Sequence, residues 1–153
     1  MAGIKRANTS GITKTGTAIP DVPDAPTIGT ATNVGTSRAY NNGSATVAYT
    51  AATTGGAVTT FTATSSPGGF TATGSSPITV TGLQSNTAYT FTVTGTNATA
   101  TGPASSASGS ITATTVPQAP TIGTATDSGS GRAYNNGSAS VTFTAGATGG
   151  SSI

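Results

Sequence analysis

The chain has 153 residues, a length that fits one or two domains. Only 5% of its residues are charged, against about 25% in a typical soluble domain, and the formal net charge is +2. Cysteine, histidine and tryptophan are absent, and Asp21, Asp24 and Asp127 are the only carboxylate side chains. Without imidazole or thiol groups, we expect no catalytic residues, no metal site and no cofactor. The composition favours a binding or structural protein over an enzyme.

The basic residues do not form the stripe that nucleic-acid binding requires. Arg38 and Arg132 are isolated, and only Lys5, Arg6 and Lys14 lie near one another. We therefore expect no nucleic-acid partner. No stretch approaches the ~18 apolar residues of a membrane-spanning helix, and the basic N-terminus is not followed by the ~7–15 apolar residues of a signal peptide. We expect neither membrane insertion nor N-terminal export.

An internal repeat is the clearest signal in the chain. Residues 22–59 recur without a gap as residues 116–153, with 25 identities in 38 aligned positions. The unit is therefore about 94 residues long and spans 22–115, and 116–153 aligns with its first part. Fewer than ~40 residues seldom close a core on their own. We expect 116–153 to be the first part of a second domain, completed by further chain or, as the alternative, by a partner.

Residues 1–21 precede the repeat and have no counterpart before the second copy, where Thr115 leads directly into Val116. The segment holds three of the five basic residues, and its large aliphatic residues are too sparse to build a core. We expect an extended docking arm, which would add to a sheet edge or lie in a groove. The alternative is a leader without fixed structure. The anchoring candidates are Ile4, Lys5, Arg6, Ile12 and Lys14.

Within the unit, apolar residues alternate with threonine, a pattern that predicts strands rather than helices. Clusters of Gly, Pro, Asn and Ser separate the runs. Seven short strands at this spacing are typical of a β-sandwich with Greek-key connections, so the predicted fold class is all-β. The expected strands lie near 27–33, 44–51, 57–64, 70–73, 77–81, 88–97 and 105–114.

Two loops carry residues that a partner would contact. Residues 38–43 read Arg-Ala-Tyr-Asn-Asn-Gly and recur intact at 132–137. This motif is either a recognition loop that offers Arg38, Tyr40, Asn41 and Asn42, or a tight turn in which Asn and Gly take positive φ. Asn-Gly favours the turn. Phe70 follows Pro-Gly-Gly and is either an exposed contact or, as aromatic burial favours, a cap on the core.

Residues 83–93, which read Leu-Gln-Ser-Asn-Thr-Ala-Tyr-Thr-Phe-Thr-Val, resemble the second half of a fibronectin type III domain. Leu83, six residues before Tyr89, matches that family's tyrosine corner, which implies a buried ring with its hydroxyl bonded to nearby backbone. The opening Pro-x-x-Pro-Thr is similar to the family's first strand, and residues 61–83 are similar to variants in bacterial and phage repeat proteins. The second strand lacks the family's usual tryptophan and has Val47 and Tyr49 there instead.

The resemblance implies immunoglobulin-like sandwiches of the fibronectin type III kind, preceded by the arm. With the lack of catalytic groups, it leads to the hypothesis of a non-enzymatic, multi-copy component of a phage virion, assembled in the host cytoplasm as a fibre or a decoration of the head, neck or tail. Its partners would be other virion proteins and, through weak multivalent loop contacts, host surface glycans. The alternatives are a bacterial surface or extracellular adhesion module and an accessory domain of a longer secreted protein.

Overall fold

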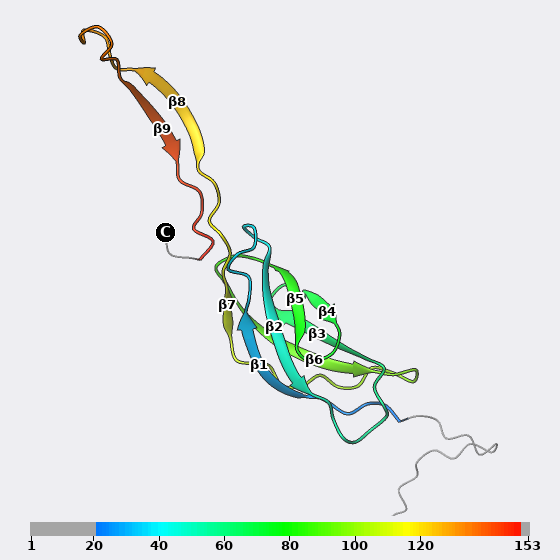
Figure 1. Ribbon diagram of the computed structural model, residues 1–153. Helices are drawn as coiled ribbons and strands as arrows, with labels where there is room; N and C mark the ends of the chain where they lie inside the picture. The colour runs from blue at the N-terminus through cyan, green and yellow to red at the C-terminus, as the bar shows by residue number, and fades with distance from the viewer. Residues whose placement is uncertain (1–20, 151–153) are drawn as a thin grey trace, which may run out of the picture.

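The computed structural model describes residues 21–150. The anchoring candidates Ile4, Lys5, Arg6, Ile12 and Lys14 lie outside the described residues, as does almost all of the expected arm. Within 21–150 every regular element is a β-strand, which confirms the all-β prediction (Figure 1). The strands are β1 (Thr27–Asn33), β2 (Gly43–Thr50), β3 (Thr60–Ser66), β4 (Thr71–Thr73), β5 (Ile78–Leu83), β6 (Thr87–Thr96), β7 (Ile111–Ala113), β8 (Thr121–Asp127) and β9 (Ala139–Thr144).

The first seven strands form two antiparallel sheets, with the orders β1-β2-β5 and β4-β3-β6-β7. The chain passes from one sheet to the other between β2 and β3, between β4 and β5, and between β5 and β6. Strands β8 and β9 form a separate antiparallel hairpin. The described chain therefore consists of one two-sheet unit followed by a two-stranded element.

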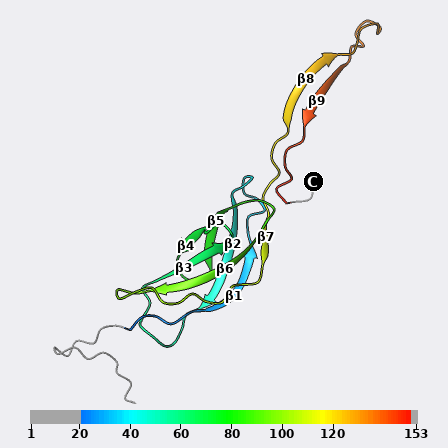
Figure 2. The same cartoon turned by 180° about the vertical axis from the view of Figure 1, so that it is seen from behind.

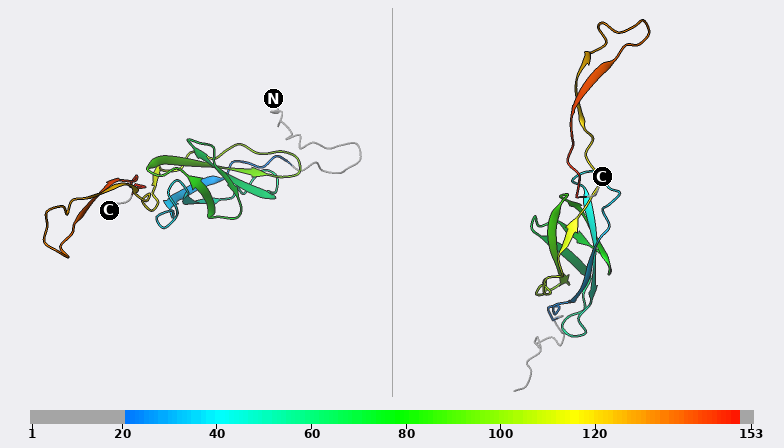
Figure 3. Two further views of the ribbon diagram at one scale, coloured as in Figure 1. Left: turned by 90° about the horizontal axis from the view of Figure 1, so that it is seen from above. Right: turned by 90° about the vertical axis from the view of Figure 1, so that its left-hand side faces the viewer.

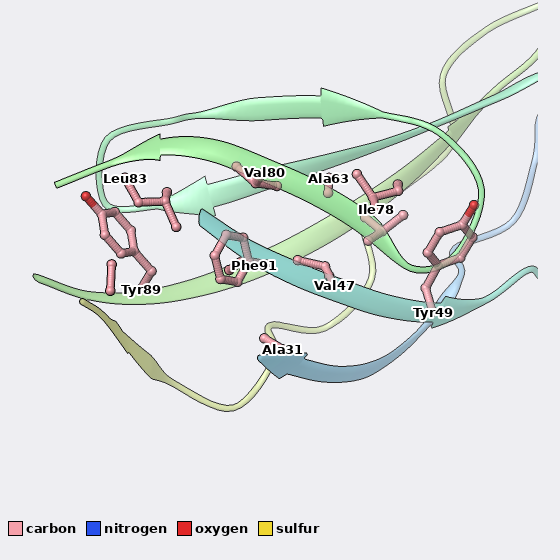
Figure 4. Packing of buried hydrophobic residues seen from close by; sticks show 12 residues of the cluster. Ala31, Val47, Tyr49, Ala63, Ile78, Val80, Leu83, Tyr89 and Phe91 are labelled. Carbon is pink, nitrogen blue, oxygen red and sulfur yellow. The ribbon is translucent and has the colours of Figure 1, made fainter. Parts of the chain in front are cut away.

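One hydrophobic core lies between the two sheets (Figure 4). The alternation in the sequence produces it: along β2 the side chains of Ala45, Val47 and Tyr49 are buried, and those of Thr46 and Ala48 between them are only half-buried. Strand β6 alternates in the same way. The core residues are Ala31, Ala45, Val47, Tyr49, Ala63, Ile78, Val80, Leu83, Tyr89, Phe91, Val93 and Ala113.

Two of the expected strands differ from the observed ones. The third begins at Thr60, not near residue 57, and runs to Ser66. The last covers only Ile111–Ala113 of the expected 105–114. Ahead of β7, residues 105–110 follow the edge of β6 without regular pairing. Two buried serines make the contact instead.

Ser105 and Ser108 pair with β6 through both backbone and side chain. The Ser108 N–H donates to the carbonyl of Phe91 (2.8 Å), and the Phe91 N–H donates to the Ser108 hydroxyl (3.0 Å). Ser105 repeats the arrangement with Val93, at 2.9 and 3.0 Å. The bonded residues are two positions apart on β6 (Phe91 and Val93) but three apart on the edge segment (Ser105 and Ser108). Because of this mismatch the backbone carbonyls of the edge segment do not stay in register with the N–H groups of β6, and serine hydroxyls accept the hydrogen bonds in their place. A period-2 pattern does not encode this pairing.

The β8–β9 hairpin copies the β1–β2 hairpin in register. Ile28 pairs with Tyr49 and Ala31 with Val47; their counterparts 94 residues later, Ile122 with Phe143 and Ala125 with Val141, pair in the same way. Both hairpins carry an irregularity between the two pairs. No second sheet among the described residues covers β8–β9, and Val141 and Phe143 are 51% and 70% exposed.

The described molecule is elongated. The hairpin extends from one end of the two-sheet unit, and the blue start of the described chain lies at the opposite end (Figures 1 and 3). The segments that lead into β8 and out of β9 run side by side near the end of the unit (Figure 2), where the Gln118 N–H donates to the carbonyl of Ala147 (2.8 Å). The β8–β9 hairpin of the second copy thus extends the molecule beyond the end of the first unit.

Candidate functional site

The 38–43 motif is a structured turn at the end of the unit from which the hairpin leaves. Asn41 adopts φ 58°, the left-handed conformation that asparagine tolerates better than most residues. The Asn42 N–H donates to the carbonyl of Ala39 (2.9 Å) and closes the turn. The structure thus shows the tight turn, with one correction: positive φ falls on Asn41 and not on Gly43.

Gly43 is already the first residue of β2, and its role is close packing. A Cβ at this position would lie 3.0 Å from the carbonyl oxygen of Leu83 and 3.3 Å from the Cβ of Ala113. The Asn-Gly pair therefore does not form the two-residue hairpin turn that its sequence indicates. Instead, the glycine lets β2 approach the end of β5.

Three of the four candidate contact residues in this turn are engaged within the protein. The Arg38 guanidinium donates to the backbone carbonyl of Asn42 (2.6 Å) and to its side-chain oxygen (3.1 Å). The Asn41 N–H donates to the Ser85 hydroxyl (2.8 Å), and the Ser85 N–H donates to the Asn41 side-chain oxygen (3.1 Å). Tyr40 is half-buried. These bonds fix the shape of the turn within the described unit, while Asn41 and Asn42 remain exposed.

Tyr89 anchors the turn between β5 and β6. Its side chain is 2% exposed, and its hydroxyl accepts a hydrogen bond from the N–H of Gln84 (3.0 Å). Leu83 is fully buried beside it, and the two side chains lie at one end of the core (Figure 4). The hydrogen bond and the burial hold the turn that carries Ser85 against the core.

Phe70 packs on the same end of the core. Its ring lies edge-on to that of Tyr89, with centroids 6.1 Å apart, and the side chain is half-buried. Gly68 makes this possible, because its φ is +82° and a Cβ there would lie 2.5 Å from Cε2 of Phe70. Phe70 therefore packs against the core as a partly buried side chain, and whether its exposed part contacts a partner stays a prediction.

A shallow depression lies at the other end of the unit. Tyr49 and Phe61, with ring centroids 4.6 Å apart, form part of its lining together with small and hydroxyl-bearing residues. The Tyr49 hydroxyl donates to the carbonyl of Gly74 (3.0 Å). Burial raises the pKa of this hydroxyl above its ordinary value, and a backbone hydrogen bond at Ser76 opposes the effect only in part. The residues that line the depression carry no charge at neutral pH.

The described residues bring no acid–base or metal-binding groups together. Within 21–150, no three metal-ligating side chains lie close enough to hold an ion, and no helix is long and apolar enough to cross a membrane. The carboxylate of Asp127 takes part in a local hydrogen bond, since one of its oxygens accepts from the N–H of Gly129 (2.8 Å). The described residues present turns, sheet edges and the exposed face of β8–β9 to solvent.

Comparison with known proteins does not assign a family. A scan against protein-family models finds no match, and a search of the curated proteins finds no significantly similar sequence.

Proposed function

We propose that the chain is a non-enzymatic structural component of a phage virion, either a fibre or a decoration of the head, neck or tail, present in several copies. The observation that carries this proposal is the reuse of one structural unit along an elongated chain. The second copy repeats the β1–β2 register at the far end of the first unit. Successive units of low charge are suited to holding binding loops at a distance from the particle rather than to catalysing a reaction.

We further propose that residues 22–115 form an immunoglobulin-like sandwich of the fibronectin type III kind and that 116–153 begin a second one. Support comes from seven strands in sheets of three and four around one core. It also comes from Tyr89, whose hydroxyl bonds to backbone five residues upstream, as a tyrosine corner requires. Because such sandwiches host many functions, the fold supports the virion role only together with the sequence resemblance.

In this proposal the N-terminal arm, residues 1–21, attaches the protein to capsid, neck or tail subunits. The units project outward, and loops at their ends make weak contacts with host surface glycans that multivalency strengthens. Arm residues Ile4 and Ile12 would supply spaced apolar contacts, and Lys5, Arg6 and Lys14 would supply charge. The particle, in the host cytoplasm during assembly and outside the cell afterwards, would be its location.

The test is to search purified virions for the protein by mass spectrometry and by immunogold microscopy. We expect the protein in particles, with gold at a fixed position, and its absence from virions would refute the proposal. Deletion of residues 1–20 should prevent incorporation while circular dichroism shows an unchanged β fold. If the deleted protein enters particles normally, attachment does not depend on the arm.

A bacterial surface or extracellular adhesion module is the alternative, because a weakly charged chain of repeated units would serve it equally well. The two proposals predict different locations. Protease treatment of intact, phage-free cells would release peptides of a surface protein but not of a virion component. Recovery of these peptides would favour the adhesion module.

A further inference from the structure

The start of the second copy is hydrogen-bonded to the end of the first unit. The Val116 N–H donates to the carbonyl of Arg38 (3.0 Å). One residue earlier, Thr115 is buried, with its hydroxyl 2.6 Å from that of Ser85. The side-chain amide of Asn33, at the end of β1, donates to the hydroxyl of Thr114 (2.6 Å). Three consecutive residues of the connection are thus held by three different parts of the first unit.

The parts that hold the connection are themselves tied together. Asn41 and Ser85, 44 positions apart, exchange two hydrogen bonds between the 38–43 turn and the β5–β6 turn. Arg38 bonds to Asn42 within its own turn, which fixes the backbone that presents the Arg38 carbonyl to Val116. We call Asn33, the 38–43 turn and Ser85 the joint surface.

From the other side, the second copy closes on the same connection. The Thr115 N–H donates to the carbonyl of Gly149 (2.9 Å). Gly149 has φ +68°, and a Cβ there would lie 2.6 Å from the carbonyl oxygens of both Thr115 and Val116. Its counterpart Gly55, with φ +79°, approaches the Val22 carbonyl in the same way. In each copy, therefore, a glycine with positive φ packs closely against the backbone of the opening segment, and no other residue can replace this glycine without strain.

We propose that the joint surface is a docking surface for the start of the next copy of the repeat, which it holds through Val116 and through Thr114 and Thr115, the two residues that end the first unit. The occupant is another repeat unit of this chain's own chemistry. In the second copy, the 132–137 turn is the corresponding surface for the opening segment of a further copy. The proposal rests on the contacts at residues 114–116 and holds whether or not the protein belongs to a virion.

The repeat provides a matched control for the key residue. Asn41 and Asn135 lie in identical motifs and have φ angles of 58° and 61°, and within residues 21–150 it is Asn41 that has a serine partner 44 residues away. Replacing either asparagine by glycine removes the side chain and keeps the left-handed turn accessible. Asn41→Gly alone should therefore loosen the joint.

The experiment is amide hydrogen exchange on the full chain, read at Val116. In the wild type we expect this amide to be protected. Asn41→Gly should speed its exchange about tenfold, the effect of one net hydrogen bond, and Asn135→Gly should leave it unchanged. Ser85→Ala, which removes the partner of both Asn41 and Thr115, should act like Asn41→Gly. Amides of β6 report whether each variant stays folded.

Three outcomes would overturn the proposal. The first is a wild-type Val116 amide that exchanges as fast as in an unstructured peptide. The second is Val116 protection that survives both Asn41→Gly and Ser85→Ala. The third is an equal effect of Asn135→Gly, since the exchange rate of the Val116 amide would then not depend specifically on the joint surface.

Discussion

Val47 and Val141 hold the same position in the two copies, and their environments differ completely. Val47 is fully buried between the two sheets, whereas Val141 is 51% exposed on a hairpin face that no other described strand covers. Replacing valine by alanine removes two methyl-sized groups. At about 0.8 kcal/mol per buried group, with a further cost for the cavity, Val47→Ala should lower the free energy of unfolding by about 2–3 kcal/mol. Val141→Ala should change it by less than about 0.5 kcal/mol.

The assay is urea unfolding of the full chain, followed by tyrosine fluorescence because the chain has no tryptophan. Val47→Ala should shift the midpoint to lower urea without changing the slope, and Val141→Ala should leave the midpoint in place. If both variants unfold at the wild-type midpoint, Val47 does not lie in a core. If both shift equally, the face of β8–β9 that carries Val141 is covered in solution, and the reasoning about the second copy is wrong.

Three further predictions concern single contacts in the first unit. Tyr89→Phe, which deletes the acceptor for the Gln84 N–H, should cost about 0.5–1.5 kcal/mol in urea unfolding, and Tyr89→Ala about 3–5; an unchanged midpoint for Tyr89→Ala would contradict the packing described for this ring. Ser108→Ala leaves a buried N–H on β6 without its acceptor and should cost about 1–3 kcal/mol, whereas Ser106→Ala, at an exposed site, should have little effect; equal effects would refute the hydroxyl pairing. Because burial raises the pKa of Tyr49, the contribution of this hydroxyl to stability is fully present below the unfolded-state pKa of about 10 and is lost as the pH rises through the folded pKa. Tyr49→Phe should therefore reduce the fall in melting temperature at alkaline pH. The same fall in both proteins would contradict this prediction.

The sequence predicts the strands well wherever a half-buried sheet imposes alternation. The second strand, predicted at 44–51, is found at Gly43–Thr50, because the buried Ala45, Val47 and Tyr49 alternate with half-buried residues. The edge segment that contains Ser105 and Ser108 could not be predicted. Its Ala, Ser and Gly residues have no apolar period, and its pairing uses hydroxyl acceptors whose value depends on the strand beside them.

The candidate site was less predictable, because its contacts join positions far apart in the chain. The motif at 38–43 stands out in the sequence because it recurs intact at 132–137. The hydrogen bond between Asn41 and Ser85 is a tertiary contact, and nothing in the local sequence indicates it. Phe70 illustrates the same limit: the sequence leaves both a cap and a surface contact open, and its packing on the Tyr89 ring joins residues 19 positions apart.

The two copies also separate what the local sequence encodes from what tertiary contacts add. Among the described residues no second sheet covers the hairpin β8–β9, yet it keeps the register and the irregularity of β1–β2, so neither needs that cover. Asn135 has φ 61°, close to the 58° of Asn41, although the structure describes no serine partner for it, so the left-handed turn does not depend on that hydrogen bond. Binding to a preformed surface avoids much of the entropy cost of ordering it. A short turn repeated intact in both copies is therefore well suited to receive the opening segment of each following unit, and this gives a physical reason why the motif recurs unchanged while other exposed positions of the repeat differ.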